Sequence, residues 1–287
     1  MKSGFVNIFG KPNAGKSTLL NLLVGEKLAI VTPKVQTTRH RIKGIVTTAE
    51  YQIIFSDTPG IIEPRYKLHE KMMDAVKSAR EDADVKLFVA DITDNPEEVE
   101  TVFAAFKDKT PTIVVINKTD LAPEKVPDSI SFFHGKGYKH VLPISCTMGA
   151  GIAELMNLIV SLLPEGIPFY DEENLTDLPM RFFVGEIIRE KIFLLYEEEV
   201  PYHTTVLVQE FKEKSTLVKI RADIIVQRET QKAILLGRRG AMIKELGTQS
   251  RKEIEAFIGN KVFLELFVKV RPRWRDNDTH LREYGYS

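Results

Sequence analysis

Lysines, hydroxyls and acidic side chains occur in three short runs whose spacing suits phosphate and base recognition. The first run is GKPNAGKS at residues 10–17. It matches G-x-x-x-x-G-K-S, a loop whose backbone N–H groups cradle phosphates, with a lysine for the terminal phosphates and a hydroxyl for magnesium. The runs DTPG at residues 57–60 and NKTD at residues 117–120 follow in that order. Together the three runs predict a nucleotide site.

The third run indicates which base is bound. The carboxylate of Asp120 can accept hydrogen bonds from both the N1–H and the N2 amino group of guanine, whereas adenine offers no such pair of donors. A site built to bind one base rejects its analogue by leaving buried polar groups unpaired, roughly 10^4-fold in well-formed cases. We therefore expect GTP and GDP as the ligands.

The elements that must position these runs alternate between strands and helices up to residue 163. Apolar runs predict strands at residues 5–9, 41–47, 51–55, 85–90, 112–116 and 141–144. Helical periodicity follows at residues 17–24, 69–81, 97–107, 129–135 and 152–162. Such alternation predicts an α/β P-loop domain, a mainly parallel sheet with helices on both faces. Ligands bind at the carboxyl ends of such strands, where all three runs lie.

The second part of the chain has a different pattern. Residues 164–180, rich in proline and acidic residues, are predicted to be a linker. Residues 181–287 predict the order α-β-β-α-α-β, with the run GRRG at residues 237–240 between the last two helices. This is the arrangement of an α+β type II KH domain. Glycines there would let a nucleic acid backbone approach, although a helix–helix turn that merely uses glycine is the alternative.

Charge is balanced overall but unevenly distributed. The 40 basic and 40 acidic residues divide into 20 and 24 for residues 1–180, and 20 and 16 for residues 181–287. Between Arg228 and Arg275 there are 12 basic and 5 acidic residues, a net charge of +7, which favours a polyanionic partner over a merely solvated face. Cys146 is the only cysteine, so a reducing compartment is expected. No apolar run approaches the roughly 20 residues that a membrane span needs.

These motifs, in this order, resemble the Era GTPases of bacteria and organelles. The resemblance extends over nearly the whole chain, including the run QTTRH at residues 36–40 and the closing residues 274–286. It implies a GTP-hydrolysing switch that binds the single-stranded 3′ end of small-subunit ribosomal RNA and acts in maturation of the small ribosomal subunit. It also implies a cytoplasmic monomer with a peripheral contact at the inner face of the membrane. The rival hypothesis is a GTP-dependent protein or membrane switch whose KH-like part is a docking scaffold without RNA.

The resemblance also assigns roles to individual residues. Lys16 would contact the β and γ phosphates, and Ser17 would ligate Mg2+, which Asp57 would hold through water. Thr38 would reach the metal when a γ-phosphate is present, with Thr37 as the competing candidate. The expected catalytic residues are Lys16, Thr38 and Gly60. The expected nucleotide-binding residues are Gly10, Lys11, Pro12, Asn13, Ala14, Gly15, Lys16, Ser17, Thr18, Asp57, Thr58, Pro59, Gly60, Ile61, Asn117, Lys118, Asp120, Ser145 and Cys146.

Three positions of the nucleotide site need separate comment. Related switches place a glutamine after the glycine of the second run to orient water, and Ile61 has no polar group for this task. Intrinsic hydrolysis should therefore be slow. Asn13 either helps to hold K+ beside the phosphates or only stabilises its own loop. Cys146 stands where relatives usually have alanine, and its backbone N–H is expected to contact the guanine carbonyl.

The RNA site is expected around the GRRG run. The expected RNA-binding residues are Gly237, Arg238, Arg239, Gly240 and Lys244. An apolar groove for unstacked bases would be lined by Ile224, Ile234, Leu235, Ile243 and Ile254, with ordinary core packing as the alternative for such residues. Trp274, Tyr284 and Tyr286 could stack on bases, with packing against the domain as the alternative.

Overall fold

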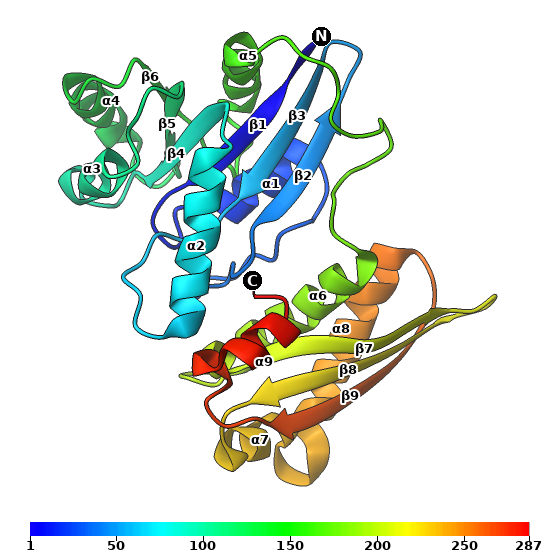
Figure 1. Ribbon diagram of the computed structural model, residues 1–287. Coiled ribbons are helices and arrows are strands. Elements are labelled where there is room, and N and C mark those ends of the chain that lie inside the picture. Colours follow the sequence, from blue (N-terminus) through cyan, green and yellow to red (C-terminus); the bar gives the residue numbers. More distant parts are fainter. Residues whose placement is uncertain (287) are drawn as a thin grey trace. The chain divides into compact units, whose positions relative to one another are not determined.

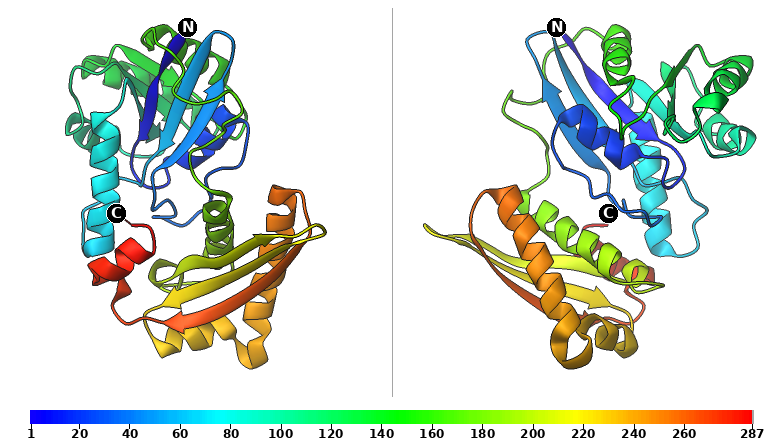
Figure 2. Two further views of the ribbon diagram at one scale, coloured as in Figure 1. Left: turned by 45° about the vertical axis from the view of Figure 1, so that its right-hand side comes forward. Right: turned by 180° about the vertical axis from the view of Figure 1, so that it is seen from behind.

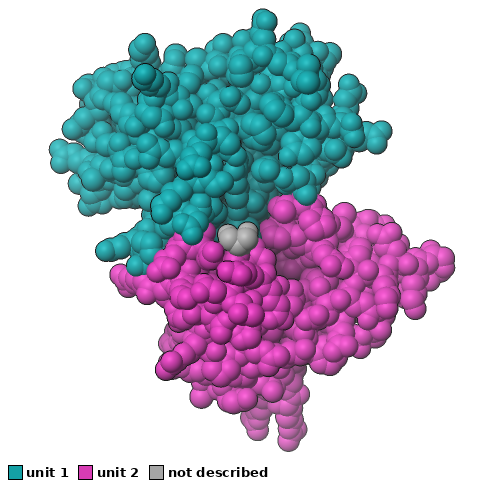
Figure 3. Space-filling view, in the orientation of Figure 1, with its two compact units in different colours: residues 1–64, 72–177 teal, residues 65–71, 178–287 magenta. Residues whose placement is uncertain are grey.

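The computed structural model describes residues 1–286, which form two compact units. The first unit consists of residues 1–64 and 72–177, and the second of residues 65–71 together with the chain from residue 178 onward (Figure 3). The last residue of the predicted range 181–287 lies outside the described residues.

The first unit is built on a six-stranded sheet in the order β2-β3-β1-β4-β5-β6. Strand β2 is antiparallel to β3, and the other neighbouring pairs are parallel. The strands are β1 (Lys2–Phe9), β2 (Ile42–Thr47), β3 (Tyr51–Asp57), β4 (Val85–Asp91), β5 (Thr112–Asn117) and β6 (His140–Pro143). The helices are α1 (Lys16–Val24), α2 (Lys67–Glu81), α3 (Pro96–Ala104), α4 (Val126–Gly135) and α5 (Ile152–Leu162).

Helices cover both faces of this sheet, as the α/β class requires (Figures 1 and 2). On the face that α2 covers, Val76, Phe103 and Phe133 from three helices pack against the strand residues Phe9 and Phe88. Strand β4 is buried along nearly its whole length, which explains why it reads as a continuous apolar run in the sequence. The predicted fold of this part is confirmed.

Local sequence explains where individual elements begin. Asn95 caps α3, since its side chain accepts a hydrogen bond from the N–H of Glu97 at 2.9 Å, and Pro96 occupies the first helical position. Both residue types are favoured at these places. Helix α1 begins directly after Gly15, whose φ of 96° suits glycine. A Cβ on Gly15 would also lie 2.1 Å from Asn117 Nδ2.

The second unit contains a three-stranded sheet, β7-β8-β9, packed against helices. Strand β8 is antiparallel to β7 and parallel to β9. The main elements of the second unit are α6 (Met180–Leu195), β7 (Thr205–Glu213), β8 (Val218–Val226), α7 (Glu229–Leu236), α8 (Ala241–Ile258), β9 (Val262–Val270) and a short α9 (Asp278–Glu283). The order from α6 to β9 is the predicted α-β-β-α-α-β, and the fold class of this part is confirmed. Helix α9 was not predicted.

The segment after α5 is bound to the first unit as far as Asp177. The N–H of Ile45 in β2 donates to the carbonyl of Leu175 at 2.8 Å, and the Gln52 side chain donates to the carbonyl of Tyr170 at 2.7 Å. Lys43 pairs with Asp177 at 2.8 Å. The bond to Ile45 occupies part of the edge of β2, and residues 164–177 belong to the first unit, although composition predicted a linker over residues 164–180.

Within residues 1–286, no helix has both the length and the apolar character needed to cross a membrane.

Candidate nucleotide site and RNA groove

The phosphate loop connects the buried strand β1 to helix α1 and ends on a buried lysine. The Lys16 ammonium donates to the carbonyls of Gly10 at 3.1 Å and Lys11 at 2.8 Å, so its side chain follows the inside of the loop. Gly60, from the second run, lies so close that a Cβ there would be 2.9 Å from the backbone of Pro12. The first and second runs are therefore adjacent, as a shared phosphate site requires.

Three oxygen-bearing side chains meet beside this loop. Ser17 Oγ donates to Asp57 Oδ2 at 2.6 Å and lies 2.8 Å from Thr38 Oγ1. Thr38 Oγ1 is in turn 3.3 Å from Asp57 Oδ2. The other carboxylate oxygen, Asp57 Oδ1, is buried and has no hydrogen-bond partner among the described residues. An unpaired buried oxygen is unfavourable unless something binds it.

This donor set fits Mg2+. Magnesium prefers oxygen ligands and is usually bound by one or two carboxylates, substrate phosphates and water. Within residues 1–286 there is no group of three or more His, Cys, Asp or Glu side chains that could hold a metal ion. A metal at Ser17, Thr38 and Asp57 would have room for phosphate oxygens and water as further ligands.

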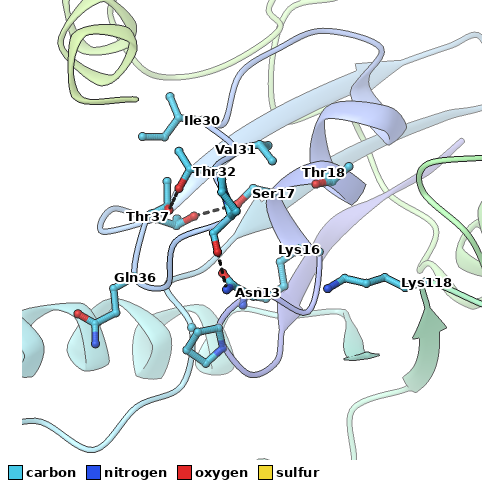
Figure 4. Close-up of a pocket in the computed structure, with 15 residues that line it drawn as sticks. Asn13, Lys16, Ser17, Thr18, Ile30, Val31, Thr32, Gln36, Thr37 and Lys118 are labelled. Atoms are coloured by element: carbon cyan, nitrogen blue, oxygen red, sulfur yellow. Dashed lines mark hydrogen bonds between the residues drawn. The ribbon is translucent and has the colours of Figure 1, made fainter. Parts of the chain in front are cut away.

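The two neighbouring threonines have different surroundings. Thr37 Oγ1 donates to the carbonyl of Lys34 at 2.7 Å and lies 2.7 Å from Thr32 Oγ1, so it braces its own loop (Figure 4). Thr38 Oγ1 contacts Ser17 and Asp57. This geometry favours Thr38 as the residue that meets the metal.

Burial shifts the two charged groups of the phosphate site in opposite directions. It lowers the pKa of Lys16 to about 8, against the opposing effect of Asp57. It raises the pKa of Asp57 to about 6, although Lys16 and the hydroxyls of Ser17 and Thr38 oppose this shift. In such a poorly hydrated place the lysine attracts phosphate more strongly than an exposed lysine would.

The third run is joined to the phosphate loop by a buried asparagine. Asn117 Nδ2 donates to the carbonyl of Ala14 at 3.0 Å, and its Oδ1 accepts from the N–H of Cys146 at 3.2 Å. Ser145 Oγ donates to Asp120 Oδ1 at 2.5 Å, which orients the carboxylate expected to read guanine. Burial raises the pKa of the Cys146 thiol to about 12, so this thiol is not a reactive thiolate at neutral pH.

A cavity of about 380 Å³ lies over the phosphate loop (Figure 4). Its walls include residues expected from the motifs, among them Asn13, Lys16, Thr38 and Lys118. The cavity includes Lys118 of the third run, but its lining does not include Asp120, Ser145 or Cys146. The residues that sequence analysis did not identify come from the segment before β2: Ile30, Val31, Thr32, Pro33 and Gln36. Gln36 opens the QTTRH run, whereas no motif marks the other four, and only their nearness to that run could have indicated them.

Asn13 and Ile61 both have defined contacts within the first unit. Asn13 Nδ2 donates to the carbonyl of Pro33 at 3.0 Å, which joins the phosphate loop to the segment before β2 rather than to its own backbone. Ile61 packs against the apolar core beneath α2, and its N–H donates to the carbonyl of Gly10 at 3.2 Å. Its side chain is therefore committed to packing.

The GRRG run forms a tight turn between α7 and α8. Gly237 has φ of 68°, and a Cβ there would be 2.5 Å from Met242 Cγ, so only glycine fits. Arg238 and Arg239 are exposed. Arg239 adopts φ of 53°, which is uncommon for a residue other than glycine. The turn thus presents two arginine side chains to solvent.

A groove of about 400 Å³ runs between α8 and β9. Basic side chains (Lys244, Arg251) and apolar ones (Ile243, Phe263, Leu264, Leu266) line it. Among the described residues β9 pairs with β8 alone, so its other edge is free for the groove. The groove therefore combines the charge and the apolar surface that single-stranded nucleic acid needs.

Several predicted groove residues are in fact core residues. Ile224, Leu235 and Ile254 are fully buried between the sheet and the helices. Helical and strand periodicity cannot distinguish a core position from a groove position, which explains the error. Ile234 is about half exposed and does not line the groove. Of the five, only Ile243 does.

The aromatic residues near the end of the chain pack against the domain. Trp274 is fully buried and its indole N–H donates to the carbonyl of His203 at 3.0 Å. Tyr284 and Tyr286 are also buried, and their rings contact Trp274. They are unavailable for stacking on bases in this arrangement, so the packing alternative holds.

Both parts of the chain match known protein families. Residues 5–118 match a family model described as 50S ribosome-binding GTPase, and residues 199–275 match one described as KH domain. GTPase Era of Geobacter sp. (strain M21) is 46% identical over 293 residues, covering 100% of this chain and 98% of that protein. A chloroplastic GTPase ERA-like protein of Oryza sativa subsp. japonica is 44% identical, covering 100% of this chain and 70% of that protein.

Two solved structures are similar along the full length. One is an Aquifex aeolicus Era variant bound to GDP and AlF4−, with 42% identity, a TM-score of 0.96 and 100% coverage of both chains. The other is Era in complex with MgGDPNP and nucleotides 1506–1542 of 16S ribosomal RNA, with 42% identity, a TM-score of 0.96 and coverage of 100% and 99%. The chain belongs to the Era GTPase family.

Proposed function

We propose that this chain is a GTP-hydrolysing switch that binds the single-stranded 3′ end of small-subunit ribosomal RNA and acts in small-subunit maturation. One observation carries the proposal. The same chain contains a phosphate loop with convergent oxygen ligands and a basic groove beside a G-x-x-G turn, and over its whole length it is 42% identical to an Era structure in complex with MgGDPNP and 16S RNA.

The nucleotide site explains the hydrolytic part. Lys16 is buried inside the phosphate loop, where its ammonium would stabilise the negative charge that develops on the γ-phosphate during hydrolysis. Ser17, Thr38 and Asp57 would hold Mg2+, which when bound neutralises charge on the phosphate oxygens. Thr38 also belongs to the QTTRH run at residues 36–40, and its contact with the metal would report whether a γ-phosphate is present.

The groove explains the RNA part. Arg238, Arg239 and Lys244 are exposed, and cations there would contact phosphates. The apolar residues of α8 and β9 would receive unstacked bases. Because such contacts need a free backbone and splayed bases, the groove favours single-stranded RNA over a duplex.

Slow hydrolysis and its dependence on K+ follow from two residues. Ile61 supplies no water-orienting bond, so catalysis must come from charge and positioning. We expect single-turnover GTP hydrolysis to be severalfold faster in K+ than in Na+ at fixed ionic strength, because an ion of the right size near Asn13 would stabilise charge that develops on the bridging oxygen. Asn13→Ala should remove this ion dependence with a smaller effect on GDP binding.

The control is Asn157→Ala, an exposed asparagine on α5, which should keep the K+ effect. ATP should not be hydrolysed in either salt. Equal rates of GTP hydrolysis in the two salts for the unmodified protein would eliminate K+ and leave a group supplied by a partner as the source of charge. Absence of any GTP hydrolysis would overturn the proposed function itself.

A further inference from the structure

Two lysines of the nucleotide motifs are paired with acidic residues from a segment that no motif marks. Lys118 Nζ donates to Asp91 Oδ2 at 2.5 Å, and Lys11 Nζ donates to Glu98 Oε2 at 2.9 Å. Asp91 ends β4 and Glu98 lies in the first turn of α3. The connection between β4 and α3 therefore lies beside the nucleotide site.

The two pairs differ in burial. The side chains of Lys11 and Glu98 are 25% and 68% exposed, and ion pairs of this kind contribute little. In the second pair the Asp91 side chain is 11% exposed and the Lys118 side chain is 31% exposed. A pair whose carboxylate is largely removed from water is screened less than one whose carboxylate is exposed. Loss of the Asp91 carboxylate should therefore affect the nucleotide site more than loss of the Glu98 carboxylate.

The two carboxylate oxygens of Asp91 have different hydrogen-bond partners. Oδ1 accepts from the N–H and the hydroxyl of Thr93, at 2.9 and 2.7 Å, which fixes the carboxylate plane. Oδ2 is left for Lys118. Burial by itself would raise the pKa of Asp91, but the hydrogen bonds from Lys118 and Thr93 outweigh it and hold that pKa below its usual value. The carboxylate is therefore charged at neutral pH.

The backbone places the pair at the base of the nucleotide site. Asp91 is opposite Asn117 in the β4–β5 register, and the N–H of Ile92 donates to the carbonyl of Asn117 at 3.0 Å. Lys118 has φ of 61° and lines the cavity, with its side chain directed towards the phosphate loop (Figure 4). Its flexible stem would otherwise lose rotamer freedom when a ligand orders it.

We propose that Asp91 is a positioning residue for guanine nucleotide binding, which holds Lys118 along the cavity so that the site is ordered before the nucleotide enters. The inference rests on the proposed nucleotide-binding function. Asp91 does not need to touch the nucleotide, because it acts through the ammonium of Lys118. Pre-ordering of this kind raises affinity because less side-chain conformational entropy is lost when the nucleotide binds.

The test is the affinity and the dissociation rate of GDP in Asp91→Asn. Asparagine keeps the size of the side chain and an acceptor for Thr93 but removes the charge. We expect GDP affinity to fall about tenfold, mainly through faster dissociation, and the rate of GTP hydrolysis at saturating GTP to change less than twofold. Glu98→Gln, which breaks the exposed pair from the same segment, should leave both quantities within twofold.

A double-mutant cycle distinguishes positioning from a structural role. Lys118→Met keeps the stem and removes the ammonium, and it should lower GDP affinity by about the same factor. In that background Asp91→Asn should add less than a twofold effect, because the partner through which it acts is gone. This measurement also serves if Asp91→Asn alone folds poorly, since Lys118→Met must still lose affinity.

Three results would overturn the proposal: unchanged GDP affinity in Asp91→Asn, unchanged affinity in Lys118→Met, or an undiminished effect of Asp91→Asn in the Lys118→Met background. The last result would assign Asp91 to the stability of its own turn. Failure of the proposed function is distinguishable, because the unmodified protein would then not bind GDP at all.

Discussion

Asp120→Asn should abolish the preference for guanine and create one for xanthine. The carboxylate only accepts hydrogen bonds, whereas an amide presents a donor to the N1–H and N2 amino groups of guanine and can complement the C2 oxygen of xanthine. Ser145 Oγ, which donates to Asp120 Oδ1 at 2.5 Å, can donate equally to an amide oxygen. We expect GTP affinity to fall roughly 10^2- to 10^4-fold while xanthosine triphosphate binds.

Competitive binding of GTP and xanthosine triphosphate measures this directly. Asp128→Asn is the matched control, since Asp128 is an exposed aspartate in the first turn of α4 and should not affect either ligand. If Asp120→Asn keeps full GTP affinity and selectivity, Asp120 does not read the base.

Replacing both Arg238 and Arg239 by Asp should lower RNA affinity at least tenfold and leave GTP binding intact. Both guanidinium groups are exposed on the turn between α7 and α8, so the changes need not disturb the core. Two negative charges would stand where the phosphate backbone should pass, which replaces attraction by repulsion. The dependence of RNA affinity on salt should also become weaker, because fewer counterions are released.

The control is Lys212→Asp with Lys214→Asp, which changes the net charge equally. Both lysines are exposed near the turn between β7 and β8 and do not line the groove. If the two double variants lose RNA affinity equally, net charge rather than the G-x-x-G turn is responsible. Unchanged RNA binding in a folded Arg238 and Arg239 variant would favour the docking-scaffold hypothesis.

Sequence patterns predicted the features that depend on local chemistry. The phosphate loop, the alternation of strands and helices, and the G-x-x-G turn each require particular residue types at fixed spacing, and each was identifiable. The choice between Thr37 and Thr38 was not, because adjacent hydroxyls differ only in which partners the folded loop brings near. In the folded loop the Thr37 hydroxyl is hydrogen-bonded to the carbonyl of Lys34, and the Thr38 hydroxyl to the hydroxyl of Ser17.

Features that depend on tertiary contacts had no signal in the sequence. Asp91 reads as an ordinary strand-ending aspartate until the fold places it beside Lys118. Ile254 and Ile243 have the same residue type on one helix, and only packing decides that one is core and the other lines the groove. Helix α9, with six residues, is too short for its periodicity to be recognised. These are the limits of patterns that describe one element at a time.

Filter binding of single-stranded RNA tests the central claim most directly. Short RNAs with the sequence of the 3′ end of small-subunit ribosomal RNA would be titrated against the unmodified protein, with a polyanion of equal charge as the competitor. The account predicts saturable binding of the RNA that the polyanion displaces poorly, since apolar residues of the groove contact bases as well as phosphates. Equal affinity for the RNA and the polyanion, or no binding of either, would contradict it.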